Sequence, residues 1–278
     1  MEAEALGVLV VVPRAGVERE EAGSNTLWSH GARTMKEEQL LTELVSRLKK
    51  ASGENLLSVI LYGSAATDEF QPKHSDLNVL CILLDLSRGE LSKLHAASTW
   101  WVKKGHPAPL FFTLNELHHS ADIFAIELLD IKAARRILYG EDVVASLHVP
   151  TDLHRLHVER ELRNNTLRLR QYYVMHAADS RKTFQLMVSS ISTFVALFRH
   201  ALIALGEEPP PTKRATVDRA GSALEFDPSA FHTVLDIREG RKRERDVEVQ
   251  ATFDKYLKAV VKATEEVDRW LAIPTSTE

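Results

Sequence analysis

Cysteine, excess charge and long apolar runs are all scarce in this chain of 278 residues. Its one cysteine, Cys81, excludes an intramolecular disulfide, and this fits a reducing compartment. The formal net charge of -4 gives no general attraction to nucleic acids. No apolar run approaches the roughly 18 residues of a membrane span, and the residues before the short apolar stretch Leu6–Val12 are acidic, unlike those of a secretory signal. We therefore expect a cytoplasmic protein without a membrane or nucleic-acid partner.

The periodicity of the sequence predicts two domains behind an N-terminal extension. Residues 1–34 show no sustained apolar period, and we expect them to form a disordered extension. From Met35 onward apolar residues recur at helical spacing, so we also hypothesise that Met35 is the natural start. Pro150 and the polar residues after it are typical of a short linker. These features predict a first domain over residues 35–150 and a second over residues 151–273.

The stretch from Leu56 to Leu84 carries the strongest chemical signal. Its first part is apolar and β-branched up to Tyr62, which predicts a strand. Gly63 ends this strand, because a residue without a side chain lets the backbone turn sharply and approach a ligand. Ser64 follows, and its hydroxyl adds to the free N–H groups of a short helix that opens there. The pattern predicts an anion-binding turn at Gly63 and Ser64.

Two polar residues begin the next predicted strand. Asp76 and Asn78 lie two residues apart, so the alternation of side chains places both on one face. Gly63-Ser64, a spacer and an acid-x-acid-like pair at a strand start resemble the signature of nucleotidyltransferases of the DNA polymerase beta superfamily. The resemblance is to the small bacterial branch that includes the kanamycin and streptomycin nucleotidyltransferases. It implies that Gly63 and Ser64 bind the nucleotide. Lys73 is a further candidate phosphate contact, although a loop lysine beside a proline is more often solvated.

Asn78 departs from the family pattern, which has a second carboxylate at this position. The resemblance implies divalent ions, Mg²⁺ or Mn²⁺, held by both strand carboxylates and by a third one from a later strand. Asparagine offers one carbonyl oxygen and no charge. Removing a unit charge about 4 Å from another costs on the order of 4 kcal/mol of Coulomb attraction. We therefore expect this site to bind metal more weakly, or to bind one ion instead of two.

The third carboxylate is expected in the segment Ile123–Ile131, whose apolar residues predict a strand. An acid in a largely buried strand is costly unless it is paired or coordinates a metal. Glu127 is favoured over Asp130, because Glu127 is central in the run and has apolar residues on both sides. In this interpretation Asp76, Asn78 and Glu127 are the metal ligands. The alternative is that Glu127 pairs with Arg135 or Arg136 and takes no part in chemistry.

Beyond residue 150 the pattern changes to long amphipathic helices. Apolar stripes at helical spacing predict three such helices, near residues 153–175, 182–205 and 249–271. Long striped helices favour an antiparallel bundle. The expected fold class is therefore α+β: a nucleotidyltransferase-like mixed β-sheet flanked by helices, followed by a C-terminal α-helical bundle.

Two functions remain open at this point. The resemblance implies an enzyme that transfers a nucleoside monophosphate from a nucleoside triphosphate to a hydroxyl of a small molecule or protein, with Asp76 and Glu127 as catalytic residues. Because Asn78 weakens the metal site, the alternative is a protein that kept the fold and nucleotide affinity but lost transfer activity. Some relatives of this kind are antitoxins paired with helical toxin subunits. A helical protein partner or a homodimer is therefore a concrete form of the alternative.

Overall fold

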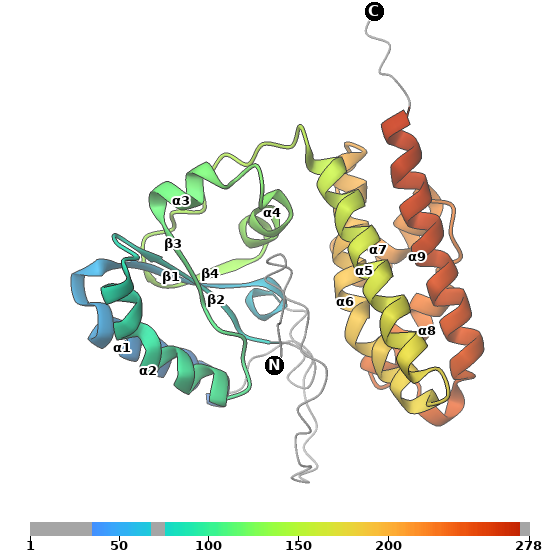
Figure 1. Ribbon diagram of the computed structural model, residues 1–278, viewed down its shortest axis with the longest axis horizontal. Coiled ribbons are helices and arrows are strands. Elements are labelled where there is room, and N and C mark those ends of the chain that lie inside the picture. Colours follow the sequence, from blue (N-terminus) through green and yellow to red (C-terminus); the bar gives the residue numbers. More distant parts are fainter. Residues whose placement is uncertain (1–34, 68–75, 273–278) are drawn as a thin grey trace, which may run out of the picture. The chain divides into compact units, whose positions relative to one another are not determined.

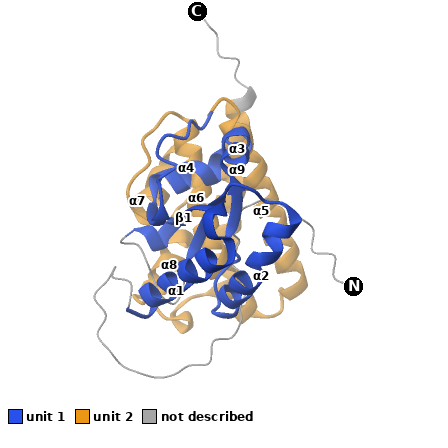
Figure 2. Cartoon of the chain, turned by 90° about the vertical axis from the view of Figure 1, so that its left-hand side faces the viewer, with its two compact units in different colours: residues 1–11, 20–150 blue, residues 12–19, 151–278 orange. Residues whose placement is uncertain are grey.

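The computed structural model describes residues 35–67 and 76–272, with side chains up to residue 270. The described residues divide into two compact units, residues 35–150 and residues 151–272, which have different colours in Figure 2. The first unit contains a sheet and helices, and the elements of the second are helices. The predicted extension over residues 1–34 and the candidate phosphate contact Lys73 lie outside the described residues.

The first unit is a four-stranded mixed sheet with helices on both faces (Figure 1). The strand order is β3-β2-β1-β4, and the strands are β1 Leu56–Tyr62, β2 Asn78–Leu83, β3 Leu110–Thr113 and β4 Arg135–Gly140. Strand β1 is antiparallel to β2 and β4, whereas β2 and β3 are parallel. The helices are α1 Met35–Ser52, α2 Arg88–Lys103, α3 Leu114–His119 and α4 Ala125–Ala133, with the 3-10 turns η1 Gly53–Asn55 and η2 Gly63–Ala66. The predicted mixed sheet flanked by helices is confirmed.

Each face of this sheet has its own core, because side chains alternate along a strand. One face includes Val59 and Cys81 and packs on α1 and α2, which contribute buried leucines and Trp101. The other face includes Ile60 and Ile82 and packs on α3, α4 and the apolar residues between 143 and 149. Cys81 is a fully buried free cysteine. It is therefore part of the core, as its apolar surroundings in the sequence indicate.

The strand predicted at Ile123–Ile131 is wrong, because most of this segment belongs to helix α4. Ala125, Leu128 and Ile131 follow one another at intervals of three residues, and all three are buried against the sheet. A short, continuously apolar run does not distinguish a buried helix from a buried strand, and this ambiguity explains the error. The fourth strand is β4, which begins two residues after α4 ends.

The second unit is a bundle of helices (Figure 1). Its elements are α5 His154–His176, α6 Ser180–Ala204, α7 Lys213–Ala223, α8 Ser229–Arg238, the 3-10 turn η3 Glu244–Asp246 and α9 Val249–Ala272. Helix α6 packs against the other four helices. Aromatic rings of α6, α8 and α9 contact one another in the core, namely Phe194, Phe198, Phe231 and Tyr256. The predicted C-terminal helical bundle is confirmed.

Helix α6 is long and apolar enough, by length and composition, to cross a membrane. Its most apolar window has a mean hydropathy of 1.6, a feature that inspection of uninterrupted apolar runs in the sequence missed. Within the bundle, 56% of that window is buried. Because α6 packs against four other helices, we interpret it as the core helix of the bundle.

Candidate functional site

The end of β1 and the start of β2 meet at one end of the sheet. Tyr62 lies opposite Asn78 in the antiparallel ladder, and Gly63 begins the turn η2 directly after Tyr62. Gly63 has a φ of +76°, a conformation that glycine adopts without strain. Its amide donates a hydrogen bond of 3.0 Å to the carbonyl of Ala134, at the end of α4. The glycine turn is therefore attached to α4, and the amide of Gly63 is engaged within the protein.

Asn78 lies on the sheet face that α3 and α4 cover, because it is opposite Tyr62, which belongs to the core on that face. Strand β2 begins at Asn78, so Asp76 precedes the strand and does not start it as predicted. Leu77, which separates them, is fully buried in the opposite core, with α1 and α2. If the backbone is extended through Leu77, Asp76 is directed to the same side as Asn78. Both side chains are half-buried. An amide thus lies at the start of β2, and a carboxylate lies two residues before it.

The side-chain amide of Asn78 has an unpaired acceptor. Within the described part of the chain, its Oδ1 atom is buried and has no hydrogen-bond partner. Its Nδ2 atom lies 3.6 Å from the position that a Cβ on Gly63 would occupy, so the amide faces the glycine turn. Burying a polar atom without a hydrogen bond costs about 1–3 kcal/mol, and native proteins leave few such atoms uncompensated. The oxygen is therefore suited to a metal ion, a water molecule or a ligand donor.

Glu127 lies on α4 instead of the predicted strand, yet it is close to the same end of the sheet. Burial, and then the negative charge of Glu127, raise the pKa of the Tyr62 phenol. Since Tyr62 is opposite Asn78, Glu127 is near the β1 side of the candidate site. Asp130, three residues further along α4, is half-buried as well. Both acids therefore stay candidates for the third carboxylate.

The two arginines considered as partners of Glu127 form ion pairs with other carboxylates at this end of the sheet. Arg135 contacts Asp142 at 2.8 Å, and its hydrogen bond holds the pKa of that carboxyl below the usual range. Arg136 contacts Glu38 of α1 at 3.0 Å. One pair links the start of β4 to the segment after β4, and the other links it to α1. Both pairs restrict movement of the backbone next to the Gly63 turn.

The oxygen atoms of Asp76, Asn78 and Glu127 are of the type that Mg²⁺ and Mn²⁺ prefer. Among residues 35–67 and 76–272, no group of three or more His, Cys, Asp and Glu side chains is arranged to hold a metal ion. Mg²⁺ sites that act on phosphates commonly use one or two protein oxygens and complete the shell with phosphate oxygens and water. The residues present fit one ion of that kind better than a pair of ions held by the protein alone.

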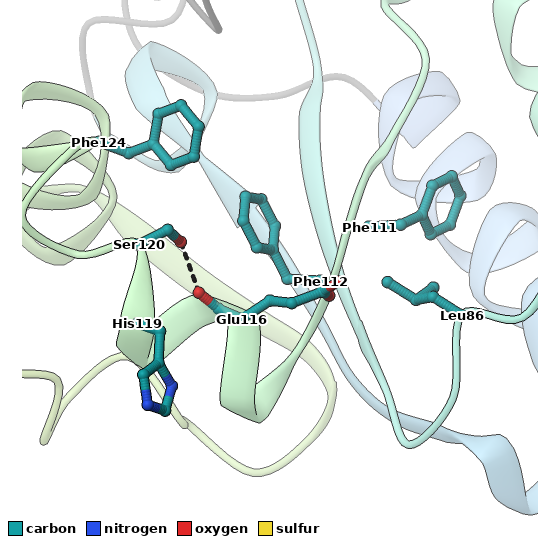
Figure 3. A pocket seen from close by; sticks show the side chains of 7 residues that line it. All are labelled: Leu86, Phe111, Phe112, Glu116, His119, Ser120 and Phe124. Atoms are coloured by element: carbon teal, nitrogen blue, oxygen red, sulfur yellow. Dashed lines mark hydrogen bonds between the residues drawn. The ribbon is translucent and has the colours of Figure 1, made fainter.

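A hollow of ≈ 450 Å³ lies elsewhere on the first unit (Figure 3). Its lining consists mostly of aromatic and aliphatic side chains, Leu86, Phe111, Phe112, Glu116, His119, Ser120 and Phe124. Figure 3 shows the rings of Phe112 and Phe124 near each other, and they meet edge to face at 6.1 Å. Phe112 pairs with Ile82, in the half of β2 that is remote from Asn78. The hollow therefore contains none of the predicted site residues.

Two further residues at the candidate site were not predicted from the sequence. The position of Tyr62 could have been inferred from the sequence, because it directly precedes Gly63. It also lies an even number of residues from Ile60, so both side chains are on the sheet face that packs on α4. His106 accepts a hydrogen bond from the amide of Leu77. No local pattern indicates this contact, because only the fold brings residue 106 beside residue 77.

The arrangement of sheet and helices is the nucleotidyltransferase fold. No family model matches the chain, and no relative was found among curated proteins. Among solved structures, the chain is similar to spectinomycin adenyltransferase AAD(9) from Enterococcus faecialis, crystallised with ATP and spectinomycin. The TM-score is 0.51, the sequence identity is 13%, and the likeness covers 83% of this chain and 99% of that chain. At this identity, the likeness shows the fold alone.

Proposed function

We propose that the protein transfers a nucleoside monophosphate from a nucleoside triphosphate to a hydroxyl group of a small molecule. The observation that carries this proposal is the buried Oδ1 of Asn78, which has no partner among the described residues and belongs to a side-chain amide whose Nδ2 lies next to the Gly63 turn. In a nucleotidyltransferase fold, an unpaired oxygen beside an aspartate and a glycine turn is suited to a metal-bound triphosphate. The solved structure of similar fold contains ATP and a small-molecule acceptor, which supports the same class of reaction.

Each residue at this end of the sheet has a role in the proposal. Asp76 and Asn78 would hold one Mg²⁺ or Mn²⁺ ion together with phosphate oxygens, and such an ion would supply positive charge to the triphosphate. Gly63 and Ser64 let the backbone approach the phosphates, and Lys73 adds a positive charge from the segment between β1 and β2. Glu127 accepts the proton of the acceptor hydroxyl.

The reaction is an in-line displacement at the α-phosphorus. The acceptor oxygen forms a bond to that phosphorus, the bond to the bridging oxygen breaks, and pyrophosphate leaves. The hydroxyl proton passes to Glu127 and then to solvent. Because Asn78 has no charge, the ion is held less tightly than it would be by two carboxylates. We therefore expect half-maximal activity to require a higher metal concentration than a site with two carboxylates would need.

Transfer of label from α-³²P nucleoside triphosphates tests the proposal. Purified protein is incubated with Mg²⁺ or Mn²⁺, with spectinomycin and, separately, with the small-molecule fraction of a bacterial extract. Asp76→Asn should reduce the rate about a thousandfold, the equivalent of about 4 kcal/mol of lost charge interaction. Asp85→Asn, an exposed position beyond the other end of β2, is the matched control and should retain activity.

The outcomes separate the two functions. Label on a small molecule that depends on Asp76 supports transfer. If the wild type binds nucleotide but transfers no label to any acceptor, the enzyme proposal is contradicted and the non-catalytic alternative gains support. Transfer by Asn78→Asp alone would identify Asn78 as the position at which a transferase lost its activity.

A further inference from the structure

His106 lies beside the strand start that carries Asp76 and Asn78. Its Nδ1 atom accepts a long hydrogen bond of 3.5 Å from the amide of Leu77. The imidazole also packs on the indole of Trp101, with the ring centroids 4.5 Å apart and the planes inclined by 34°. Trp101 is fully buried in the core between α2 and the sheet. The half-buried imidazole of His106 is thus held by a rigid core side chain.

The backbone ladder of the sheet does not reach Leu77 on this side. Strands β2 and β3 pair from Leu80, opposite Leu110, onward. Pro107 and Pro109 precede β3, and proline restricts the backbone and is confined to the ends and edges of strands. Continuing the parallel register backwards brings residue 106 near residues 76 and 77. The side chain of His106 therefore supplies an acceptor where the pairing of β3 with β2 has ended.

The Leu77 amide, which donates to His106, lies between the two site residues Asp76 and Asn78. The side chain of Leu77 is anchored in the core on one face of the sheet, and its amide is bound at the edge by His106. Asp76 and Asn78 flank this residue. Because Leu77 links the two residues, a rotation of its backbone would move the side chains of Asp76 and Asn78 relative to each other.

We infer that His106 is a positioning residue for nucleotidyl transfer, an inference that rests on the proposed function. With Trp101 as its support, Nδ1 of His106 fixes the Leu77 amide so that Asp76 and Asn78 direct their oxygens to the same metal-bound triphosphate. Nδ1 acts as an acceptor, so the ring is neutral and its proton lies on Nε2. His106 makes no bond to the substrate in this role.

Three substitutions at position 106 distinguish the contribution of the Nδ1 acceptor from that of the ring packed on Trp101. His106→Phe keeps a ring against Trp101 and removes the acceptor, whereas His106→Asn restores an acceptor near the position of Nδ1. His106→Gln places its amide near the position of Nε2, so it should behave like His106→Phe, and it serves as the second test if the phenylalanine variant folds poorly. His95→Asn, on the exposed side of α2, is the matched control.

Two measurements are made on each full-length variant. The hydrogen-exchange rate of the Leu77 amide should rise about tenfold in His106→Phe, as expected for loss of one hydrogen bond, and stay within about twofold of wild type in His106→Asn. The Kd for α,β-methylene-ATP with Mn²⁺, measured by calorimetry, should rise about tenfold in His106→Phe and in His106→Gln only.

The positioning role is overturned if His106→Asn binds as weakly as His106→Phe, because the acceptor would then be irrelevant. It is equally overturned if Leu77 exchanges faster in His106→Phe while the Kd is unchanged. A wild-type protein that binds no Mn²⁺ with the nucleotide would overturn the proposed function, and the positioning role with it. The exchange rates alone decide whether His106 holds Leu77, so the two failures are distinguishable.

Discussion

Both units bury polar atoms, but the surroundings of those atoms differ. In the helical unit, His154 and His200 are almost fully buried, and Nδ1 of His200 lies 3.1 Å from Nε2 of His154. His154 also has a buried nitrogen without a hydrogen-bond partner among the described residues, as Asn78 has an oxygen. Asn78, however, faces a glycine turn near acids, whereas His154 faces other imidazoles. An unpaired buried atom therefore indicates a ligand site only where its neighbours provide complementary chemistry.

The largest predicted effect is a difference between two glycines that have the same φ, one in each unit. Gly140 and Gly240 both have a φ of +74°. A Cβ on Gly140 would overlap the carbonyl oxygen of Leu57, whereas a Cβ on Gly240 would meet nothing within 4 Å. Gly140→Ala should destabilise the first unit by more than about 4 kcal/mol, and Gly240→Ala should cost the second unit only about 1 kcal/mol.

Urea unfolding, with hydrogen exchange read separately for peptides of each unit, measures both variants. Similar losses for the two substitutions would contradict the view that the close approach of β4 to β1, and not the backbone conformation alone, demands glycine at position 140.

The second unit should lose stability at acidic pH. Burial, and then the charges of His200 and His157, lower the pKa of His154 from 6.5 to about 4. The folded pKa is below the unfolded one, so the unfolded state binds the extra proton, and stability present above pH 6.5 is lost as the pH falls to about 4. The difference amounts to about 3 kcal/mol for the second unit.

Hydrogen exchange of α5 and α6 peptides between pH 4 and pH 8, corrected for intrinsic rates, measures this loss. His154→Leu should flatten the dependence of unfolding free energy on pH, and His176→Leu, at the other end of α5, is the matched control. The test depends on the slope of unfolding free energy against pH, so it stays valid even if His154→Leu is less stable at every pH. An unchanged slope in His154→Leu would contradict the proposed origin of the acid sensitivity.

The smallest predicted effect compares helix caps in the two units. Thr113 forms a capping box with Glu116, in which its hydroxyl accepts from the Glu116 amide at 3.1 Å and its own amide donates to the Glu116 carboxylate at 2.8 Å. Thr212 caps α7 through one bond of 3.3 Å to Ala215. Thr113→Ala should cost about 1–2 kcal/mol and Thr212→Ala about 0.5–1 kcal/mol. Chemical denaturation of both variants measures the two losses of unfolding free energy. A larger loss for Thr212→Ala than for Thr113→Ala would contradict the prediction.

Features that depend on neighbouring residues were predicted well from the sequence. Apolar, β-branched runs on either side of the segment from Gly63 to Asp76 predicted two adjoining strands, because strand propensity is a local property. Apolar stripes at helical spacing predicted the long helices of the second unit for the same reason. The sheet flanked by helices and the bundle follow from these local patterns.

Features that depend on distant residues were predicted less well. The run around Glu127 was assigned to a strand, because a short apolar run fits either a strand or a buried helix. Glu127 is nevertheless near Tyr62, since α4 packs on the face that Tyr62 shares. His106 lies 29 residues from Leu77, and only the parallel pairing of β3 with β2 brings the two together. No single stretch of sequence contains that information.

The central claim is that the start of β2 is a ligand site and not merely a part of the core. Its most direct test is the Kd for Mn²⁺ with α,β-methylene-ATP, measured by calorimetry on wild type, Asn78→Asp and Asn78→Leu, beside the free energy of unfolding of each. Leucine resembles asparagine in size and removes an unpaired buried oxygen. We therefore predict that Asn78→Leu abolishes binding but changes the free energy of unfolding by less than about 1 kcal/mol, and that Asn78→Asp binds at least about tenfold more tightly. Undiminished binding by Asn78→Leu would contradict it.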